Sequence, residues 1–207
     1  MNRRAMSKPT LPAFAPLAAL ALLLAACGSQ PASEAAGSPP LAGAKIGGPF
    51  TLVNEDGEEV SWDDFEGKYR MVYFGYAYCP DVCPFDVQRM MQGYDAFKQE
   101  RPDIAAQVQP IFITIDPERD TPEVVGEFTH AFSDDLIGLT GTAEQVETAA
   151  KAFAVYYQKG ETSAGGGYLM DHSRGAYLMG RQGEPIALLP VDEGAEGVAA
   201  ELARWTG

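Results

Sequence analysis

Two almost unbroken apolar runs lie in the middle of the chain, Met71–Tyr76 and Val108–Ile115. Short apolar runs flanked by turn residues predict strands with both faces buried, as in a parallel sheet. The segment between them has apolar residues at helical spacing from Val82 or Phe85 to about Gln99. This alternation predicts a strand, a helix and a second strand in succession, the unit from which α/β folds are built.

Weaker patterns extend this alternation toward both ends of the chain. Asp56-Gly57 is typical of a hairpin turn, and Thr142 with Gln145 three residues later is typical of a helix start. The further elements that we expect are a hairpin of Phe50–Val53 and Glu59–Ser61, a helix opening at Thr121-Pro122-Glu123, a strand at Ile137–Thr140, a helix from Thr142, strands at Gly175–Met179 and Pro185–Leu189, and a helix at Ala195–Trp205. Their order predicts an α/β fold with a mixed central β-sheet flanked by helices and an N-terminal β-hairpin.

The start of the chain has the features of an export signal rather than of this fold. Three basic residues precede an apolar segment, residues 11–24, which contains two prolines and is too short to span a membrane. Small residues then lead to Cys27, a pattern that resembles the lipobox of bacterial lipoproteins. The resemblance implies a lipoprotein signal peptide at residues 1–26 and acylation of Cys27, which would anchor the chain to a membrane. The alternative is an ordinary secretory signal followed by an unused cysteine.

The rest of the chain divides by composition. Residues 27–44 are rich in Ser, Pro, Ala and Gly and predict a lipidated flexible tether, while residues 45–207 have the length and apolar content of one domain. Removal of residues 1–26 takes away three basic residues and no acidic one, so the net charge changes from −14 to −17. Such a charge argues against nucleic acid as a partner and favours cations or basic surfaces, although solubility alone explains it equally well.

Cys79 and Cys83 directly follow the first apolar run, at the carboxyl end of a predicted buried strand. Binding sites of α/β folds usually lie at that end. Four-residue spacing puts both sulfurs on one face of a helix, and a curved loop would also bring them together. A thiolate forms more readily near a helix N-terminus, where both residues are expected. The pair is therefore suited either to closing a disulfide or to holding a thiophilic metal ion.

Six separated motifs resemble those of the Sco/SenC family and occur in the same order. They are Gly48-Pro49-Phe50-Thr51-Leu52, Phe65-Glu66-Gly67-Lys68, Phe74-Gly75-Tyr76 with Cys79-Pro80-Asp81-Val82-Cys83-Pro84, Asp116-Pro117-Glu118-Arg119-Asp120-Thr121-Pro122, Gly138-Leu139-Thr140-Gly141-Thr142 and Asp171-His172-Ser173. The resemblance implies a thioredoxin-like fold and the supply of copper during assembly of cytochrome c oxidase, chiefly to its binuclear copper centre. It also implies that Cys79, Cys83 and His172 are the ligands of one copper ion per chain.

Two sulfurs and one nitrogen suit both oxidation states of copper, because copper(I) favours soft thiolates and copper(II) takes imidazole with further N or O donors. His172 follows residues 159–167, a glycine-containing run that predicts a flexible arm, and thus a His-bearing loop over the cysteines. Asp171 is a candidate to orient the imidazole, although a role in a turn fits it as well. Asp116 is a second candidate to support the ligands. A structural role for Asp116 and Asp120, in the turn that leads into the next helix, is the alternative.

Five other residues are interpreted as structural. His130 ends a predicted helix, where a cation meets the carbonyl end favourably. Tyr168 and Met170 are interpreted as packing residues beside His172, and Met90 and Met91 as fillers of the core rather than copper ligands.

Two functions fit these residues. The first is a copper metallochaperone on the periplasmic face of a bacterial membrane, which receives copper from an upstream donor and passes it by ligand exchange to the oxidase subunit with the binuclear site. That recipient indicates the inner membrane, although Gly28 replaces the aspartate that retains many lipoproteins there. The second is a periplasmic thiol-disulfide oxidoreductase that keeps partner cysteines reduced through Cys79 and Cys83 and draws on a thiol reductant. Only the second is an enzyme, and a redox or copper sensor is a third reading.

Overall fold

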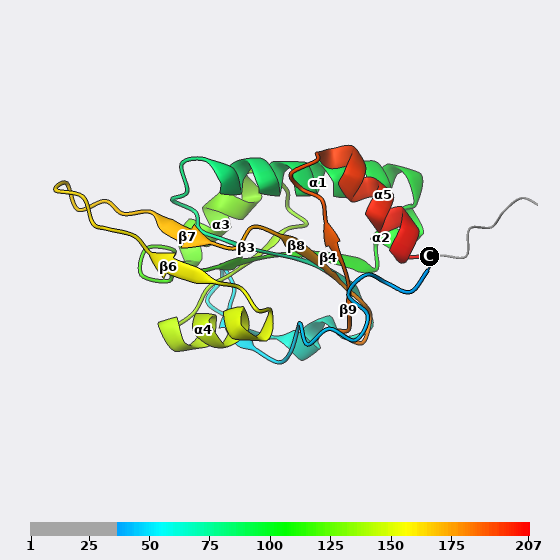
Figure 1. The fold of residues 1–207 in the computed structure, drawn as a ribbon, viewed down its shortest axis with the longest axis horizontal. Coiled ribbons are helices and arrows are strands. Elements are labelled where there is room, and N and C mark those ends of the chain that lie inside the picture. The colour runs from blue at the N-terminus through cyan, green and yellow to red at the C-terminus, as the bar shows by residue number, and fades with distance from the viewer. Residues whose placement is uncertain (1–36) are drawn as a thin grey trace, which may run out of the picture. The chain divides into compact units, whose positions relative to one another are not determined.

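A mixed five-stranded β-sheet organises the part of the chain that the computed structural model describes, residues 37–207. In sheet order its strands are β5 (Ile137–Leu139), β4 (Val108–Thr114), β3 (Tyr69–Gly75), β8 (Ala176–Met179) and β9 (Pro185–Leu189). β3, β4 and β5 run parallel, and β8 and β9 continue the sheet antiparallel. β3 is the middle strand, so its carboxyl end, which leads to the cysteines, lies at the centre of one end of the sheet (Figure 1).

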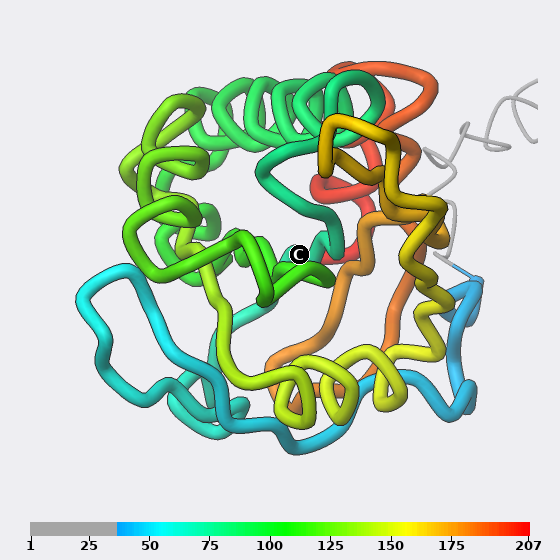
Figure 2. The backbone as a smooth tube through the Cα atoms, turned by 90° about the vertical axis from the view of Figure 1, so that its left-hand side faces the viewer, coloured from blue at the N-terminus to red at the C-terminus, as the bar shows by residue number. Residues whose placement is uncertain are grey.

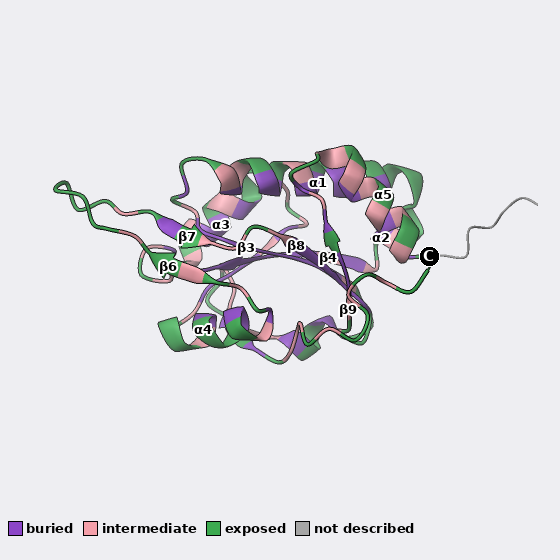
Figure 3. Ribbon diagram, viewed as in Figure 1, coloured by how far each residue is buried: buried purple, intermediate pink, exposed green. Residues whose placement is uncertain are grey.

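Helices cover both faces of this sheet, which explains why its strands are apolar on both sides. The helices are α1 (Val82–Glu100), α2 (Pro102–Ala105), α3 (Pro122–His130), α4 (Ala143–Ala152), α5 (Ala195–Trp205) and a 3₁₀ helix (Trp62–Phe65). α1, α3 and α5 lie on one face and α4 on the other (Figure 1), and the sheet between them is buried (Figure 3). Gly93 lets α1 approach α5 closely, because a Cβ atom there would lie 2.6 Å from Cβ of Val198.

Two hairpins flank the central sheet. β1 (Thr51–Val53) pairs with β2 (Glu59–Ser61), and an isolated bridge from Val53 to Thr140 joins this hairpin to the segment after β5. β6 (Tyr157–Lys159) pairs with β7 (Met170–His172) in a separate two-stranded sheet. This second hairpin projects from the domain (Figure 1) and lies beside the loop that leads into α1 (Figure 2). The chain thereby brings β7 next to the cysteines.

The structure confirms the predicted α/β order and the helix caps. Thr121 accepts a hydrogen bond from Val124 N at 3.4 Å, and Thr142 and Gln145 form the expected capping box. The 3₁₀ helix, α2 and the β6–β7 hairpin were not expected. The prediction of a flexible arm before His172 is therefore wrong for the first residue of that arm, since Lys159 is paired with Met170 in the hairpin.

Some residues before residue 45, the predicted start of the domain, contact the domain. Leu41 N donates to Ile186 O at 3.0 Å, and Leu41 and Ile46 pack against the hydrophobic core. The predicted signal peptide, Cys27 and the tether as far as residue 36 lie outside the described residues. Within residues 37–207, no helix has the length and apolar character needed to cross a membrane. Residues 37–207 share one core and belong to one compact unit.

Candidate metal centre

Cys79 and Cys83 lie where β3 passes into α1. Cys79 is in the connecting loop, and Cys83 is in the first turn of the helix. Both thiols are free, and Cys83 N donates to the Cys79 sulfur at 3.4 Å. Cys83 is fully buried, whereas Cys79 retains 9% exposure. The loop before α1 therefore brings the sulfur of Cys79 to the backbone of Cys83 and leaves Cys79 as the more accessible thiol.

Gly75, the last residue of β3, lies directly beneath the helical cysteine. A Cβ atom at this position would be 2.8 Å from Cε1 of Tyr73 and 3.1 Å from the sulfur of Cys83. Real side chains do not approach so closely without displacing a neighbour. Glycine is therefore required here by the close approach of Cys83 to the strand, and not by an unusual backbone angle.

His172 reaches the cysteines from the neighbouring hairpin. Its Nε2 lies 3.4 Å from the sulfur of Cys83, and its Nδ1 lies 2.8 Å from the carbonyl oxygen of Ser173. A carbonyl oxygen only accepts hydrogen bonds, so this contact assigns the ring proton to Nδ1 and leaves Nε2 free to accept or to bind a metal. Tyr76 packs against the ring edge to face, with centroids 6.1 Å apart. Burial lowers the pKa of His172, which keeps the imidazole neutral.

Burial also controls the protonation of Cys83. The position near the N-terminus of α1 predicts a thiolate, but this prediction is wrong for Cys83, because burial raises the pKa of its thiol. The loss of hydration outweighs the favourable helix terminus. A metal ion or a disulfide at Cys83 must therefore displace a proton, so metal binding should strengthen as the pH rises.

The three predicted ligands lie near the carboxyl end of β3, where Nε2 of His172 approaches the sulfur of Cys83 and the sulfur of Cys79 accepts from the backbone of Cys83. Among residues 37–207, no group of three or more His, Cys, Asp or Glu side chains is already arranged closely enough to hold a metal ion. The close pair is Cys83 with His172, while the Cys79 sulfur is engaged by the backbone N of Cys83. The chemistry of the donors fits a thiophilic metal.

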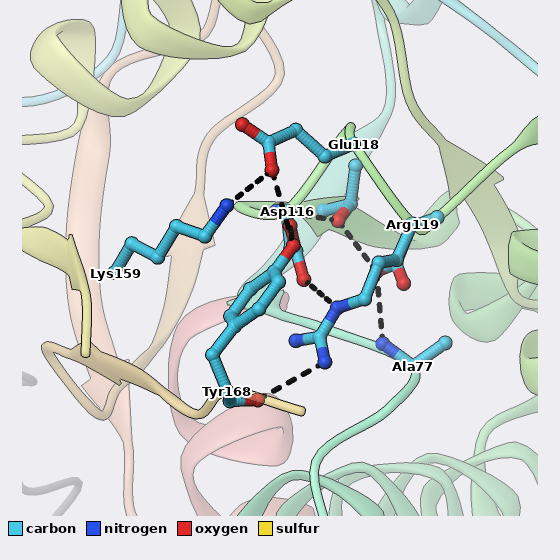
Figure 4. A network of polar contacts seen from close by, with 8 residues as sticks. Ala77, Asp116, Glu118, Arg119, Lys159 and Tyr168 are labelled. Atoms are coloured by element: carbon cyan, nitrogen blue, oxygen red, sulfur yellow. Dashed lines mark hydrogen bonds and ion pairs between the residues drawn. The ribbon is translucent and has the colours of Figure 1, made fainter. Parts of the chain in front are cut away.

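The two candidate supporting carboxylates differ in what they contact. Asp171 is exposed and forms no hydrogen bond to His172 in the described chain, since Ser173 O occupies Nδ1. Along β7, Asp171 and His172 alternate, so their side chains point to opposite faces. Asp116 is 2% exposed and accepts hydrogen bonds from Tyr168 OH at 2.8 Å and Arg119 Nε at 2.6 Å (Figure 4). Asp116 therefore contacts the hairpin and not the imidazole.

Asp120, in the same loop as Asp116, holds the loop that carries the cysteines. One of its oxygens accepts hydrogen bonds from Ala77 N at 2.8 Å and Thr114 Oγ1 at 2.6 Å. The side chain is fully buried, and burial raises its pKa. Its role extends beyond the predicted turn, because the bond to Ala77 connects the β4–α3 loop to the start of the cysteine loop.

No sequence pattern indicates the ion pair between Arg174 and Asp86. Asp86 is fully buried on α1, one turn after Cys83. Arg174 donates to both of its oxygens, from Nε at 3.1 Å and Nη2 at 2.8 Å, and Tyr73 OH donates at 3.1 Å. The pair joins the segment after His172 to the helix of Cys83. A single Asp and a single Arg separated by 88 positions have no spacing that a pattern search could recognise.

The residues interpreted as structural lie as predicted. His130 is the last residue of α3 and its Nε2 lies 4.0 Å from an oxygen of Glu55. Met90, Met91 and Met170 are buried in the hydrophobic core. The interpretation of Tyr168 as a packing residue is incomplete, because its hydroxyl group also contacts Asp116.

The sheet, the covering helices and the dithiol with a neighbouring imidazole define a thioredoxin-like α/β protein with a candidate metal site at the end of its central strand. A family model described as SCO1/SenC matches residues 38–207. The chain therefore belongs to the SCO1/SenC family.

Individual relatives agree with this assignment. The chain is 38% identical over 160 residues to the mitochondrial SCO1 homolog of Homo sapiens. This match covers 76% of this chain and 52% of the human protein. It is 45% identical over 141 residues to protein SenC of Rhodobacter capsulatus. This match covers 67% of this chain and 60% of SenC. The chain thus spans about half the length of the curated relatives that it matches.

A solved structure is similar over most of the domain. The structure of Bradyrhizobium japonicum ScoI with copper bound superimposes with a TM-score of 0.69 at 34% sequence identity, and the match covers 77% of this chain and 99% of the chain in that structure. The similarity confirms the thioredoxin-like fold that the sequence motifs imply.

Proposed function

We propose that this chain is a copper metallochaperone that holds one copper ion through Cys79, Cys83 and His172 and delivers it to the binuclear copper site of cytochrome c oxidase. The observation that carries the proposal is the 3.4 Å approach of His172 Nε2 to the sulfur of Cys83, with Cys79 beside it. Membership of the SCO1/SenC family, and a related ScoI whose structure contains copper, support the choice of metal.

The donor set suits a cargo that must be released. Two thiolates and one imidazole bind copper(I) and copper(II), yet leave coordination positions for an incoming ligand. Cys79 is the more exposed thiol, so exchange with the cysteines of a recipient starts there. Transfer in this manner needs no catalytic residue, and the chaperone is not an enzyme.

The proposed location follows from the start of the sequence. A lipid on Cys27 would hold the domain at the periplasmic face of a bacterial membrane, with residues 28–36 and the following segment as the connection. The recipient oxidase favours the inner membrane, and an upstream copper donor or a thiol reductant would act from the periplasm. Mass spectrometry of the protein from membranes tests this, because an unmodified Cys27 would contradict the lipid anchor.

Anaerobic copper titration of the reduced domain, residues 37–207, tests the metal site. We expect one copper ion per chain, with thiolate-to-copper charge-transfer absorption and a copper(II) electron paramagnetic resonance signal. His172→Ala should greatly weaken copper(II) binding and alter both spectra, because it removes the only nitrogen ligand in the set. His130→Ala is the matched control, since that exposed histidine lies at the end of α3. Equal copper(II) affinity of His172→Ala and the unaltered protein would contradict the three-ligand site.

A thiol-disulfide oxidoreductase is the second candidate function. It is favoured by the N–H group of Cys83, which points at the sulfur of Cys79 and suits a nucleophilic sulfur there. Its chemistry needs both cysteines but not His172 as a ligand. Absence of stoichiometric copper binding, together with rapid cycling of the Cys79–Cys83 disulfide and reduction of a partner disulfide, would support it over the chaperone.

A further inference from the structure

We infer that Tyr168 and Arg174 are positioning residues, which fix His172 beside Cys83 from both sides before copper binds. The inference rests on the proposed function, because it concerns the same metal site. It adds two side chains that touch neither the cysteines nor the imidazole in the described contacts.

The hairpin that carries His172 needs such support. β6 and β7 have three residues each and form a sheet of their own, without a ladder to the central sheet. An isolated two-stranded hairpin is marginally stable at best. Contacts of the hairpin with the rest of the domain therefore help to set the position of His172 relative to Cys83.

One anchor lies before His172 in the sequence. Tyr168 OH donates to the buried carboxylate of Asp116 at 2.8 Å, and Arg119 Nη1 donates to the carbonyl oxygen of Tyr168 at 3.0 Å. The ring of Tyr168 lies between two cations, with Arg119 at 3.7 Å and Lys159 at 4.0 Å from its centroid (Figure 4). Such contacts favour one orientation of the ring. Tyr168 is therefore attached to the β4–α3 loop at its hydroxyl, its ring and its backbone.

The other anchor lies after His172. Arg174 forms two hydrogen bonds with Asp86, at 3.1 and 2.8 Å, in a fork that fixes direction as well as distance. Asp86 is fully buried, and a buried carboxylate retains its partner because an unpaired buried charge is costly. Asp86 is on the same helix as Cys83, so this anchor connects the histidine segment directly to the cysteine helix.

The two anchors explain why the imidazole faces Cys83. Each ends on a carboxylate that is at most 2% exposed, Asp116 on one side and Asp86 on the other. Loss of either anchor lets the hairpin move, and copper binding must then restore the geometry at the expense of affinity. Removing groups that orient a metal ligand typically weakens binding by about 10–100-fold.

Tyr168→Phe is the mildest test, because it removes one hydroxyl and keeps the ring. We expect copper(II) affinity to fall about tenfold and the electron paramagnetic resonance spectrum to change. Arg174→Lys keeps the charge but loses the fork, and should act in the same direction. Tyr94→Phe is the matched control, because its buried hydroxyl donates to Ala105 O at 3.2 Å, in a part of the domain that shares no contact with the site. The control should bind copper as the unaltered protein does.

Comparison in the His172→Ala background separates positioning from general destabilisation. If Tyr168 acts through His172, Tyr168→Phe changes copper affinity less than twofold when the histidine is absent, since coupled residues are not additive. Unchanged affinity of Tyr168→Phe, or an equal loss in both backgrounds, would overturn the inference while leaving the metal site intact.

A readout without metal keeps this inference distinct from the proposed function. Amide hydrogen exchange at residues 170–172 should be faster in Tyr168→Phe than in the unaltered protein or in Tyr94→Phe. Should the unaltered protein bind no copper, the chaperone function fails, and exchange alone decides the role of the anchors. Faster exchange then supports them, and unchanged exchange overturns them.

Discussion

Replacement of Arg174 by glutamine leaves the carboxylate of Asp86 buried without its cation. Asp86 has no exposed surface, and only the hydroxyl of Tyr73 would still donate to it. Removal of one partner from a buried ion pair costs about 3–5 kcal/mol. The side chain of Arg174 is 47% exposed, so water shields the pair and the loss should be smaller, about 2–3 kcal/mol at pH 7.

Asp86→Asn should cost less than Arg174→Gln, although both remove the same ion pair. The neutral amide keeps the shape of the side chain, and the half-exposed Arg174 can turn to water. The expected loss is about 1 kcal/mol, as for one weakened hydrogen bond. The double variant should be more stable than Arg174→Gln alone, because it contains no unpaired buried carboxylate.

Urea unfolding of the reduced domain at pH 7 measures the three variants. A loss in Arg174→Gln no greater than in Asp86→Asn, or a double variant less stable than Arg174→Gln alone, would refute this reasoning.

Three further outcomes follow from packing and burial. Gly75→Ala puts a Cβ atom 2.8 Å from Tyr73 and 3.1 Å from the sulfur of Cys83. We therefore expect the free energy of unfolding in urea to fall by about 1–3 kcal/mol and copper binding to weaken. Normal copper affinity would contradict the close contact. Gly93→Ala gains about 1 kcal/mol of helix propensity but puts Cβ 2.6 Å from Val198. The steric cost should exceed this gain, so the variant should be less stable than the unaltered protein. A more stable variant would argue against the α1–α5 packing. Burial raises the pKa of Cys83 and of Tyr73, so the folded domain keeps protons that the unfolded chain loses above about pH 8.5 and pH 10. Stability should be full below about pH 8.5 and decline above it, and a constant urea midpoint from pH 7 to pH 10 would be inconsistent with this burial.

Local patterns were sufficient for most of the fold. The apolar runs of β3 and β4 and the capping box of Thr142 and Gln145 depend on neighbouring residues only, and the structure has all of them. The β6–β7 hairpin was missed because its strands have three residues each and a long connection, so neither a period nor a turn signal stands out.

The site itself was only partly accessible from sequence. The spacing of Cys79 and Cys83 predicts that the two residues lie together, and the family motif pointed to His172, which the structure brings to 3.4 Å from Cys83. The protonation of Cys83 could not be inferred, because its burial is produced by elements distant in the sequence. The contact of Tyr168 with Asp116 spans 52 positions and follows no period, so it became visible only in three dimensions.

The contacts of Tyr168 and Arg174 also divide the hairpin into a part whose length the metal site constrains and a part that tolerates insertions and deletions. Residues 161–167 at the tip are all exposed, so insertions or deletions there leave the metal site unchanged. Residues 168–174 connect two fixed points, and one added residue between them would turn His172 to the opposite face of β7. Natural variants and engineered fusions should therefore tolerate changes of length at the tip, and lose copper when the same change falls between Tyr168 and Arg174.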